Sequence, residues 1–198
     1  MALFIDTLDI QLMLLGGGLL VLAYWVLLNF SLNYDQQKLA EINRSFGYFF
    51  ITLGIYALAV GLWGTFVWPL PSSYNLVLTD PFSLYGIALI ALGFVNIHKV
   101  PIMGVLSGIA ILSIPVIVYG AAIMHFGMTN SPTGAGALYL LIGINGLLSP
   151  ILATKAKKYW SYIAILLLIL AGILALYIGI SAVPEHIEGW MKWAPFYG

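Results

Sequence analysis

The chain has 198 residues, of which 62% are hydrophobic and only 7% charged, and its formal net charge is zero. A soluble domain carries about 25% charged residues, so this chain lacks the side chains for a water-facing surface. The neutral charge gives no sign of a nucleic-acid partner, and the absence of cysteine excludes disulfides, thiolate metal sites and cysteine nucleophiles. The composition therefore predicts an integral membrane protein in contact with lipid.

Apolar runs of membrane-spanning length recur along the chain. A membrane-spanning helix needs about 20 predominantly apolar residues, and within lipid it satisfies its own backbone hydrogen bonds. The runs lack the strict alternation of strands, which favours helices. We therefore predict a single all-α domain, a bundle of six transmembrane helices at about residues 10–32, 46–68, 82–97, 101–126, 133–153 and 160–182.

The basic residues predict an orientation for this bundle. Basic residues in short loops favour the cytoplasmic side of a membrane. Six of the seven bases fall in the first, third and fifth connections: Lys38, Arg44, Lys99, Lys155, Lys157 and Lys158. We therefore expect a multipass protein of the cell membrane with cytoplasmic basic loops and both termini outside.

The segment WPLPSSYNLVLTDPFS, residues 68–83, joins the second and third predicted helices on the outer side. Asp80 followed by Pro81 is typical of a helix start, with Asp80 as the N-cap. We expect the preceding residues to fold back over the bundle as an ordered outer loop and candidate partner surface. In this loop, Trp68 and Tyr74 would lie at the interface, and Asn75 and Asp80 would cap backbone groups. The surface comprises Trp68, Pro69, Pro71, Tyr74, Asn75, Asp80 and Pro81.

The fourth predicted helix carries a G-x-x-x-G motif, Gly104 and Gly108, and an internal proline, Pro115. Small residues allow helices to approach closely in lipid. The motif predicts helix packing within the chain, with self-association as the alternative. Pro115 predicts a packing kink, with a hinge or a widened cavity as the alternative.

The predicted spans lack charged side chains deep in their apolar runs, so their polar residues are uncharged. The clearest of these is Asn145, near the middle of the fifth predicted helix. An interhelical hydrogen bond is the expected role of Asn145, and substrate binding is the alternative.

Beyond the sixth predicted helix, residues 183–198 form an amphipathic, aromatic tail that we expect at the membrane interface. Titratable side chains gather on the same predicted outer face. Five of them could ligate a divalent metal if they met: Asp80, His125, Glu185, His186 and Glu188. Their spacing is not diagnostic, so an acidic, solvated rim is the expected reading. We predict neither a metal nor a cofactor.

The segment around residues 60–95 resembles an uncharacterised multispan family of archaea and some bacteria, catalogued as domain of unknown function 981. The residues that carry the resemblance are Trp68, Pro69, Leu70, Pro71, Ser73, Tyr74, Asn75, Asp80, Pro81 and Gly86. The resemblance implies a multispan membrane fold and no activity.

Three functions are open at this point. The first is a non-catalytic structural or accessory subunit that self-associates or joins a larger membrane complex, with membrane lipid as its other partner. The second is a small-solute transporter or channel lined by Asn145 and the kink at Pro115. The third is a redox subunit that binds lipid, quinone or haem. No enzyme motif is present, so we do not expect an enzyme.

Overall fold

A computed structural model describes residues 7–191 of the protein. Within this range the chain forms helices and no strands. Six helical segments among them are long and apolar enough to cross a membrane, which confirms the predicted fold class. The helices in chain order are α1 (Leu8–Val26), the π-helical η1 (Leu27–Ser31), α2 (Gln36–Val67), α3 (Tyr74–His98), α4 (Met103–His125), α5 (Pro132–Leu147), the 3-10 helix η2 (Ser149–Ala153) and α6 (Lys157–Trp190).

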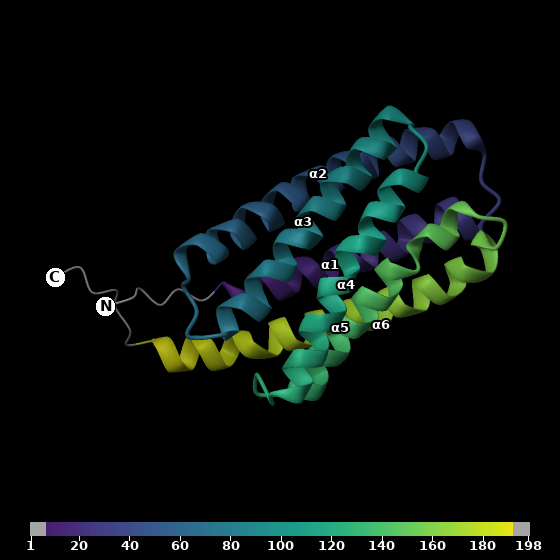
Figure 1. Cartoon of the computed structure of the whole chain (residues 1–198). Helices are drawn as coiled ribbons and strands as arrows, with labels where there is room; N and C mark the ends of the chain where they lie inside the picture. The colour runs from purple at the N-terminus through teal and green to yellow at the C-terminus, as the bar shows by residue number, and fades with distance from the viewer. Residues whose placement is uncertain (1–6, 192–198) are drawn as a thin grey trace.

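The long helices associate as three pairs, α2 with α3, α1 with α6, and α4 with α5 (Figure 1). We call one end of the bundle the terminal end. It holds the start of α1, the end of α6 and the connections 68–73 and 126–131. The opposite, basic end holds the connections 32–35, 99–102 and 154–156, with six of the seven bases in or near them.

Glycines spaced seven residues apart hold α2 against α3. A Cβ on Gly54 would lie 2.9 Å from the carbonyl oxygen of Gly86, and a Cβ on Gly86 would lie 2.8 Å from the carbonyl oxygen of Gly54. Gly47 and Gly93 face each other in the same way, with 2.8 Å and 2.7 Å to the opposing carbonyl oxygens. Only glycine permits this approach, and dispersion contacts between the two backbones stabilise the pair. The other two pairs use the same device, at Gly16 with Gly172 and at Gly120 with Gly136.

Helix α3 begins at Tyr74, and not near residue 82 as the sequence predicts. Asp80 is therefore not its N-cap, and Pro81 lies inside the helix, where it leaves the carbonyl of Val77 without its helical donor. The hydroxyl of Tyr139 in α5 donates to that carbonyl oxygen at 2.6 Å. The helix continues through the proline because a neighbouring helix satisfies the freed acceptor.

The predicted outer loop is consequently shorter, residues 68–73, and it is organised by Asn75, which is fully buried. The Nδ2 of Asn75 donates to the carbonyl oxygen of Gly64 at 2.9 Å, and its Oδ1 accepts from the backbone N–H of Leu70 at 3.2 Å. The side chain of Asn75 thus bonds backbone groups, as expected, and ties the end of α2 to the start of α3. Trp68 and Tyr74 are both partly exposed, at 46% and 37%.

Two further helix bounds differ from the predicted ones. Helix α2 begins at Gln36, and not near residue 46, because the side chain of Asp35 accepts from the backbone N–H of Lys38 at 2.9 Å and caps the helix. Helix α6 continues through Pro184 to Trp190, so residues 183–190 extend the last span and do not start a separate tail. The remainder of the predicted tail, residues 192–198, lies outside the described residues.

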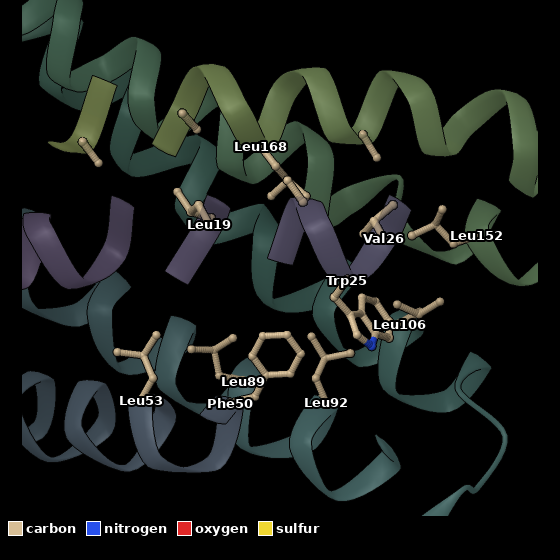
Figure 2. Close-up of a cluster of buried hydrophobic side chains, with 14 of the residues drawn as sticks. Leu19, Trp25, Val26, Phe50, Leu53, Leu89, Leu92, Leu106, Leu152 and Leu168 are labelled. Atoms are coloured by element: carbon tan, nitrogen blue, oxygen red, sulfur yellow. The ribbon is translucent and has the colours of Figure 1, made fainter. Parts of the chain in front are cut away.

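Large apolar side chains from all three pairs converge between the helices. Figure 2 shows Leu19 and Trp25 of α1, Phe50 of α2, Leu89 of α3 and Leu168 of α6 in this cluster. The indole nitrogen of Trp25 donates to the Oδ1 of Asn96 in α3 at 2.9 Å. This hydrogen bond joins the α1–α6 pair to the α2–α3 pair near the basic end of the bundle.

Candidate functional site

The converging side chains surround a cavity of about 570 Å³. Residues of α1, α3, α4, α5 and α6 line it, together with the connection 129–131 and η2. Its lining on α1 extends from Leu8 to Val26, which is on the order of 27 Å at about 1.5 Å per helical residue. The cavity is therefore long and narrow, and it follows the bundle axis through most of the membrane-spanning length.

Most of the lining is aliphatic or aromatic. The apolar side chains come from five helices: Leu12, Leu15, Leu19, Leu22, Trp25 and Val26 of α1; Phe82, Leu89 and Leu92 of α3; Leu106, Ile109, Leu112 and Val116 of α4; Leu138 and Ile142 of α5; and Ala164, Leu168 and Leu174 of α6. A cavity of this size and lining is typical of sites that bind apolar small molecules. Such sites also carry a few polar groups that orient the bound molecule.

One group of polar residues lies where the cavity reaches the terminal end. The Nδ1 of His186 in α6 is 2.7 Å from the Oδ2 of Asp9 in α1, so this pair links the two helices. Glu185, Asn130 and Ser131 also line this end. The sequence analysis singled out Glu185 and His186 but missed Asp9, whose only signal was its place at the start of the first span.

A second polar group lies on the wall formed by α4, α5 and η2, nearer the basic end. The hydroxyl of Ser113 donates to the carbonyl oxygen of Ile109 at 2.7 Å, and that of Ser149 donates to the carbonyl oxygen of Leu106 at 3.1 Å. Asn145 lies on the same wall and is only 8% exposed. Its side chain forms no hydrogen bond with any of the described residues.

The two residues predicted to line a solute path, Asn145 and Pro115, therefore do not lie on the same side of the helices. Asn145 lines the cavity, and the interhelical hydrogen bond expected of it is not formed within residues 7–191. Pro115 is absent from the described lining and is exposed on the outward face of α4. The inward face of that helix carries Ser113 and Val116. A proline in the sequence marks an irregular turn of a helix but not the direction in which that turn faces.

The five residues considered for a metal do not come together. Within the described part of the chain, no three His, Asp or Glu side chains form a group that could hold a metal ion. Asp80 bonds residues of α2 and α4, and His186 bonds Asp9. His125 packs edge-on against Phe126 at the end of α4, and Glu188 is exposed.

Asp80 is a carboxylate inside a membrane-length helix, which the sequence analysis did not foresee because it started that helix too late. Its Oδ1 accepts from the hydroxyl of Thr65 in α2 at 2.7 Å, and its Oδ2 accepts from the hydroxyl of Tyr119 in α4 at 3.3 Å. The Thr65 oxygen is also 3.0 Å from the carbonyl oxygen of Gly61, so its one hydrogen serves one acceptor at a time. Asp80 thereby connects three helices near the terminal end.

Gly104 and Gly108 do not pack against another helix of the described chain. A Cβ added to either would meet nothing within 4 Å, whereas the glycines between the paired helices are in tight contact. Ile111 and Val118 continue the same exposed face of α4, at 67% and 60% exposure, with Pro115 between them. The prediction that this motif packs helices within the chain is therefore wrong, and its alternative, self-association, stays a prediction.

Comparison with protein families finds a match over most of the chain. A family model described as "Protein of unknown function (DUF981)" matches residues 1–189, which is nearly the whole chain. Neither a search of curated proteins nor a search of solved structures finds a match. The interpretation of the cavity therefore rests on its own geometry.

Proposed function

The chain belongs to the DUF981 family of proteins of unknown function, and since that membership implies no activity, we propose a function from the geometry of the bundle. In this proposal the protein is a non-catalytic membrane protein that holds one elongated, mostly apolar molecule, a membrane lipid or a similar long-chain compound, between its helices. The observation that carries the proposal is the long apolar cavity of about 570 Å³.

The chemistry of the lining supports an apolar occupant over an ion or a polar solute. Conduction of a polar solute needs hydrogen-bonding or charged groups along its path. The cavity reaches Asn145, which is one requirement of the transport alternative, but its wall is apolar over most of its length. An apolar chain packs against such a wall by dispersion contacts alone and needs no such groups. Holding a lipid-like molecule therefore has more support than transport.

The haem form of the redox alternative has little support. Bis-histidine ligation requires two imidazoles near one point. Among the described lining residues, His186 is the one histidine. His98 ends α3 at the basic end, and His125 is exposed at the end of α4. A lipid or a quinone remains consistent with the cavity because neither needs axial ligands.

The occupant can be tested by purifying the full chain from its native membranes in mild detergent and measuring retained lipid-like molecules by native mass spectrometry. Ala88 of α3 lines the cavity, whereas Ala121 of α4 is exposed and outside the lining. We expect Ala88→Phe to reduce the retained mass by narrowing the cavity and Ala121→Phe to leave it unchanged. Equal retention by both variants would place the bound molecules on the outer surface and contradict the proposal.

Self-association is the second candidate function, because one observation favours it. The exposed face of α4 that carries Gly104 and Gly108 has the composition of a helix-packing surface but no partner within the described chain. In this proposal, two copies pack through that face, alone or within a larger membrane complex. The lipid cavity and the α4 face point in different directions from α4, so the two functions are compatible.

The orientation of the bundle also remains a proposal. Six bases lie in or near the basic end, and only Lys192, of the seven, comes after α6. This asymmetry favours a cytoplasmic basic end in a cell membrane, with the terminal end outside. The His186–Asp9 pair and the connection 68–73 would then face the external medium.

A further inference from the structure

The cavity wall contains a polar group that the fold itself does not use. Asn145 lies on the same wall as Ser113 and Ser149, is 8% exposed and makes no hydrogen bond to the rest of residues 7–191. A carboxamide carries two N–H donors and an acceptor oxygen, and at a mostly apolar cavity wall these groups are stabilised when a ligand bonds them. A leucine would fill the same volume without such groups. The unused amide therefore indicates a hydrogen-bonding partner inside the cavity.

We propose that the cavity recognises a long-chain molecule with an uncharged oxygen head, a carbonyl or a hydroxyl, and that this head binds Asn145. The inference rests on the proposed lipid-holding function and specifies the chemistry of its ligand. The Nδ2 of Asn145 donates to a carbonyl oxygen of the ligand, or its Oδ1 accepts from a hydroxyl of the ligand. Ser113 and Ser149 donate to backbone carbonyl oxygens, so toward the ligand they offer acceptor lone pairs.

The position of Asn145 requires the head to be neutral. The lining residues with a carboxyl or imidazole side chain, Asp9, Glu185 and His186, all lie at the terminal end. Asn145 lies on the order of 14 Å from the basic end, counted along residues 145–153 at about 1.5 Å per α-helical residue and about 2.0 Å per 3-10 residue. A carboxylate or phosphate would be buried there without a counter-charge, which is strongly unfavourable. An uncharged carbonyl or hydroxyl needs only the hydrogen bond that Asn145 provides.

The remaining length of the cavity accommodates the chain of the ligand. Helix α5 begins at Pro132, so on the order of 20 Å of bundle separates Asn145 from the terminal end at about 1.5 Å per residue. Leu138 and Leu19 are among the apolar side chains that line this stretch. The chain of the ligand would extend through it toward the His186–Asp9 pair, with its head toward the basic end.

Binding of defined probes to the purified, delipidated full chain tests the inference. The probes are hexadecane, 1-hexadecanol, 2-hexadecanone, palmitate and decylubiquinone, with affinities measured by native mass spectrometry or by competition. We expect the alcohol and the ketone to bind about three- to tenfold tighter than the alkane, the gain of one neutral hydrogen bond. Tighter binding by decylubiquinone identifies a quinone as the source of the carbonyl. Tighter binding by hexadecanol identifies a lipid alcohol.

Each failure has a separate meaning. If none of the probes binds, the proposed function and this inference both fall. If the alkane binds as tightly as the alcohol and the ketone, the cavity keeps its function but the head site is overturned. Tighter binding by ionised palmitate than by hexadecanol overturns the requirement for a neutral head. These comparisons use the unmodified chain, so they do not depend on the folding of a variant.

A matched pair of variants then assigns the head to one residue. Asn145→Leu should remove the preference for the alcohol and the ketone while hexadecane binding persists. Asn130→Leu is the control, because Asn130 lines the terminal end of the same cavity, and it should keep the preference. If Asn145→Leu keeps the full preference as well, another group recognises the head and the assignment to Asn145 is wrong.

Discussion

The phenolic oxygen of Tyr139 in α5 lies 2.6 Å from the carbonyl oxygen of Val77 in α3, the acceptor that Pro81 leaves without a helical donor. This bond repairs the helix at its proline and attaches the α4–α5 pair to the α2–α3 pair. We expect Tyr139→Phe to lower the free energy of unfolding by about 0.5–2 kcal/mol, the range for hydrogen bonds between membrane helices. Thermal or denaturant unfolding in detergent measures the loss.

A double-mutant cycle with Pro81→Ala identifies the cause of that loss. Alanine at residue 81 restores a backbone N–H that can donate to Val77, so Tyr139→Phe should cost less in that background. Tyr162→Phe is the control, because Tyr162 is exposed and makes no bond within the described residues. An equal cost of Tyr139→Phe in both backgrounds would show that the hydroxyl does not serve the proline site.

The close contact of glycines between α2 and α3 predicts a larger loss of stability than Tyr139→Phe, although the substitution adds only one methyl group. A Cβ at Gly86 would lie 2.5 Å from the backbone nitrogen of Leu58 and 2.8 Å from the carbonyl oxygen of Gly54. Because those atoms belong to backbone, the helices must separate, and we expect Gly86→Ala to destabilise the protein by about 1–3 kcal/mol.

The matched control for this close contact is Gly17→Ala in α1, where an added Cβ meets nothing within 4 Å. That change should be neutral or should stabilise the helix by about 0.5–1 kcal/mol, since alanine is the better helix former. Melting temperatures of the two variants provide the comparison. Similar melting temperatures for both would contradict the close contact at Gly86.

The sequence predicted the six membrane-length helices because their signal is long and local. Each span repeats the same apolar preference over many residues, so no single misreading removes it. The start of α3 was missed for the opposite reason. Asp80–Pro81 has the local pattern of a helix start, and only the tertiary contact from Tyr139 makes a helix through Pro81 favourable.

The same distinction applies to the glycines and to the cavity. The G-x-x-x-G motif was the recognisable pattern, but the pairing of α2 with α3 uses glycines at seven-residue spacing, as at Gly47 and Gly54. That spacing was readable in the sequence and was missed. The cavity was not readable, because its wall combines residues of five helices that look like ordinary core positions. Asn145 was noted by type, and only the structure shows that its amide is unused.

The outward face of α4 predicts a change in association without a change in fold. We expect Gly108→Ile to shift the purified protein toward the monomer, because a branched side chain there separates two α4 helices packed through this face. Its melting temperature as a monomer should stay close to that of the unmodified chain, since a Cβ at Gly108 has no intramolecular neighbour within 4 Å. Light scattering coupled to gel filtration measures the mass. Ala59→Ile on the exposed face of α2 is the control, and an equal loss of association there would exclude the α4 face as the contact.

Labelling of introduced cysteines tests the proposed orientation on a clean background, since the chain contains no cysteine. Lys155→Cys lies in the exposed connection at the basic end, and Ser73→Cys lies in the exposed connection at the terminal end. With a membrane-impermeant maleimide added to intact cells, we expect Ser73→Cys to react at once and Lys155→Cys to react only after the cells are broken. The expectation follows from the concentration of bases at one end of the bundle, which favours retention of that end in the cytoplasm. Reaction of Lys155→Cys in intact cells would invert the bundle and place the Asp9–His186 end of the cavity toward the cytoplasm.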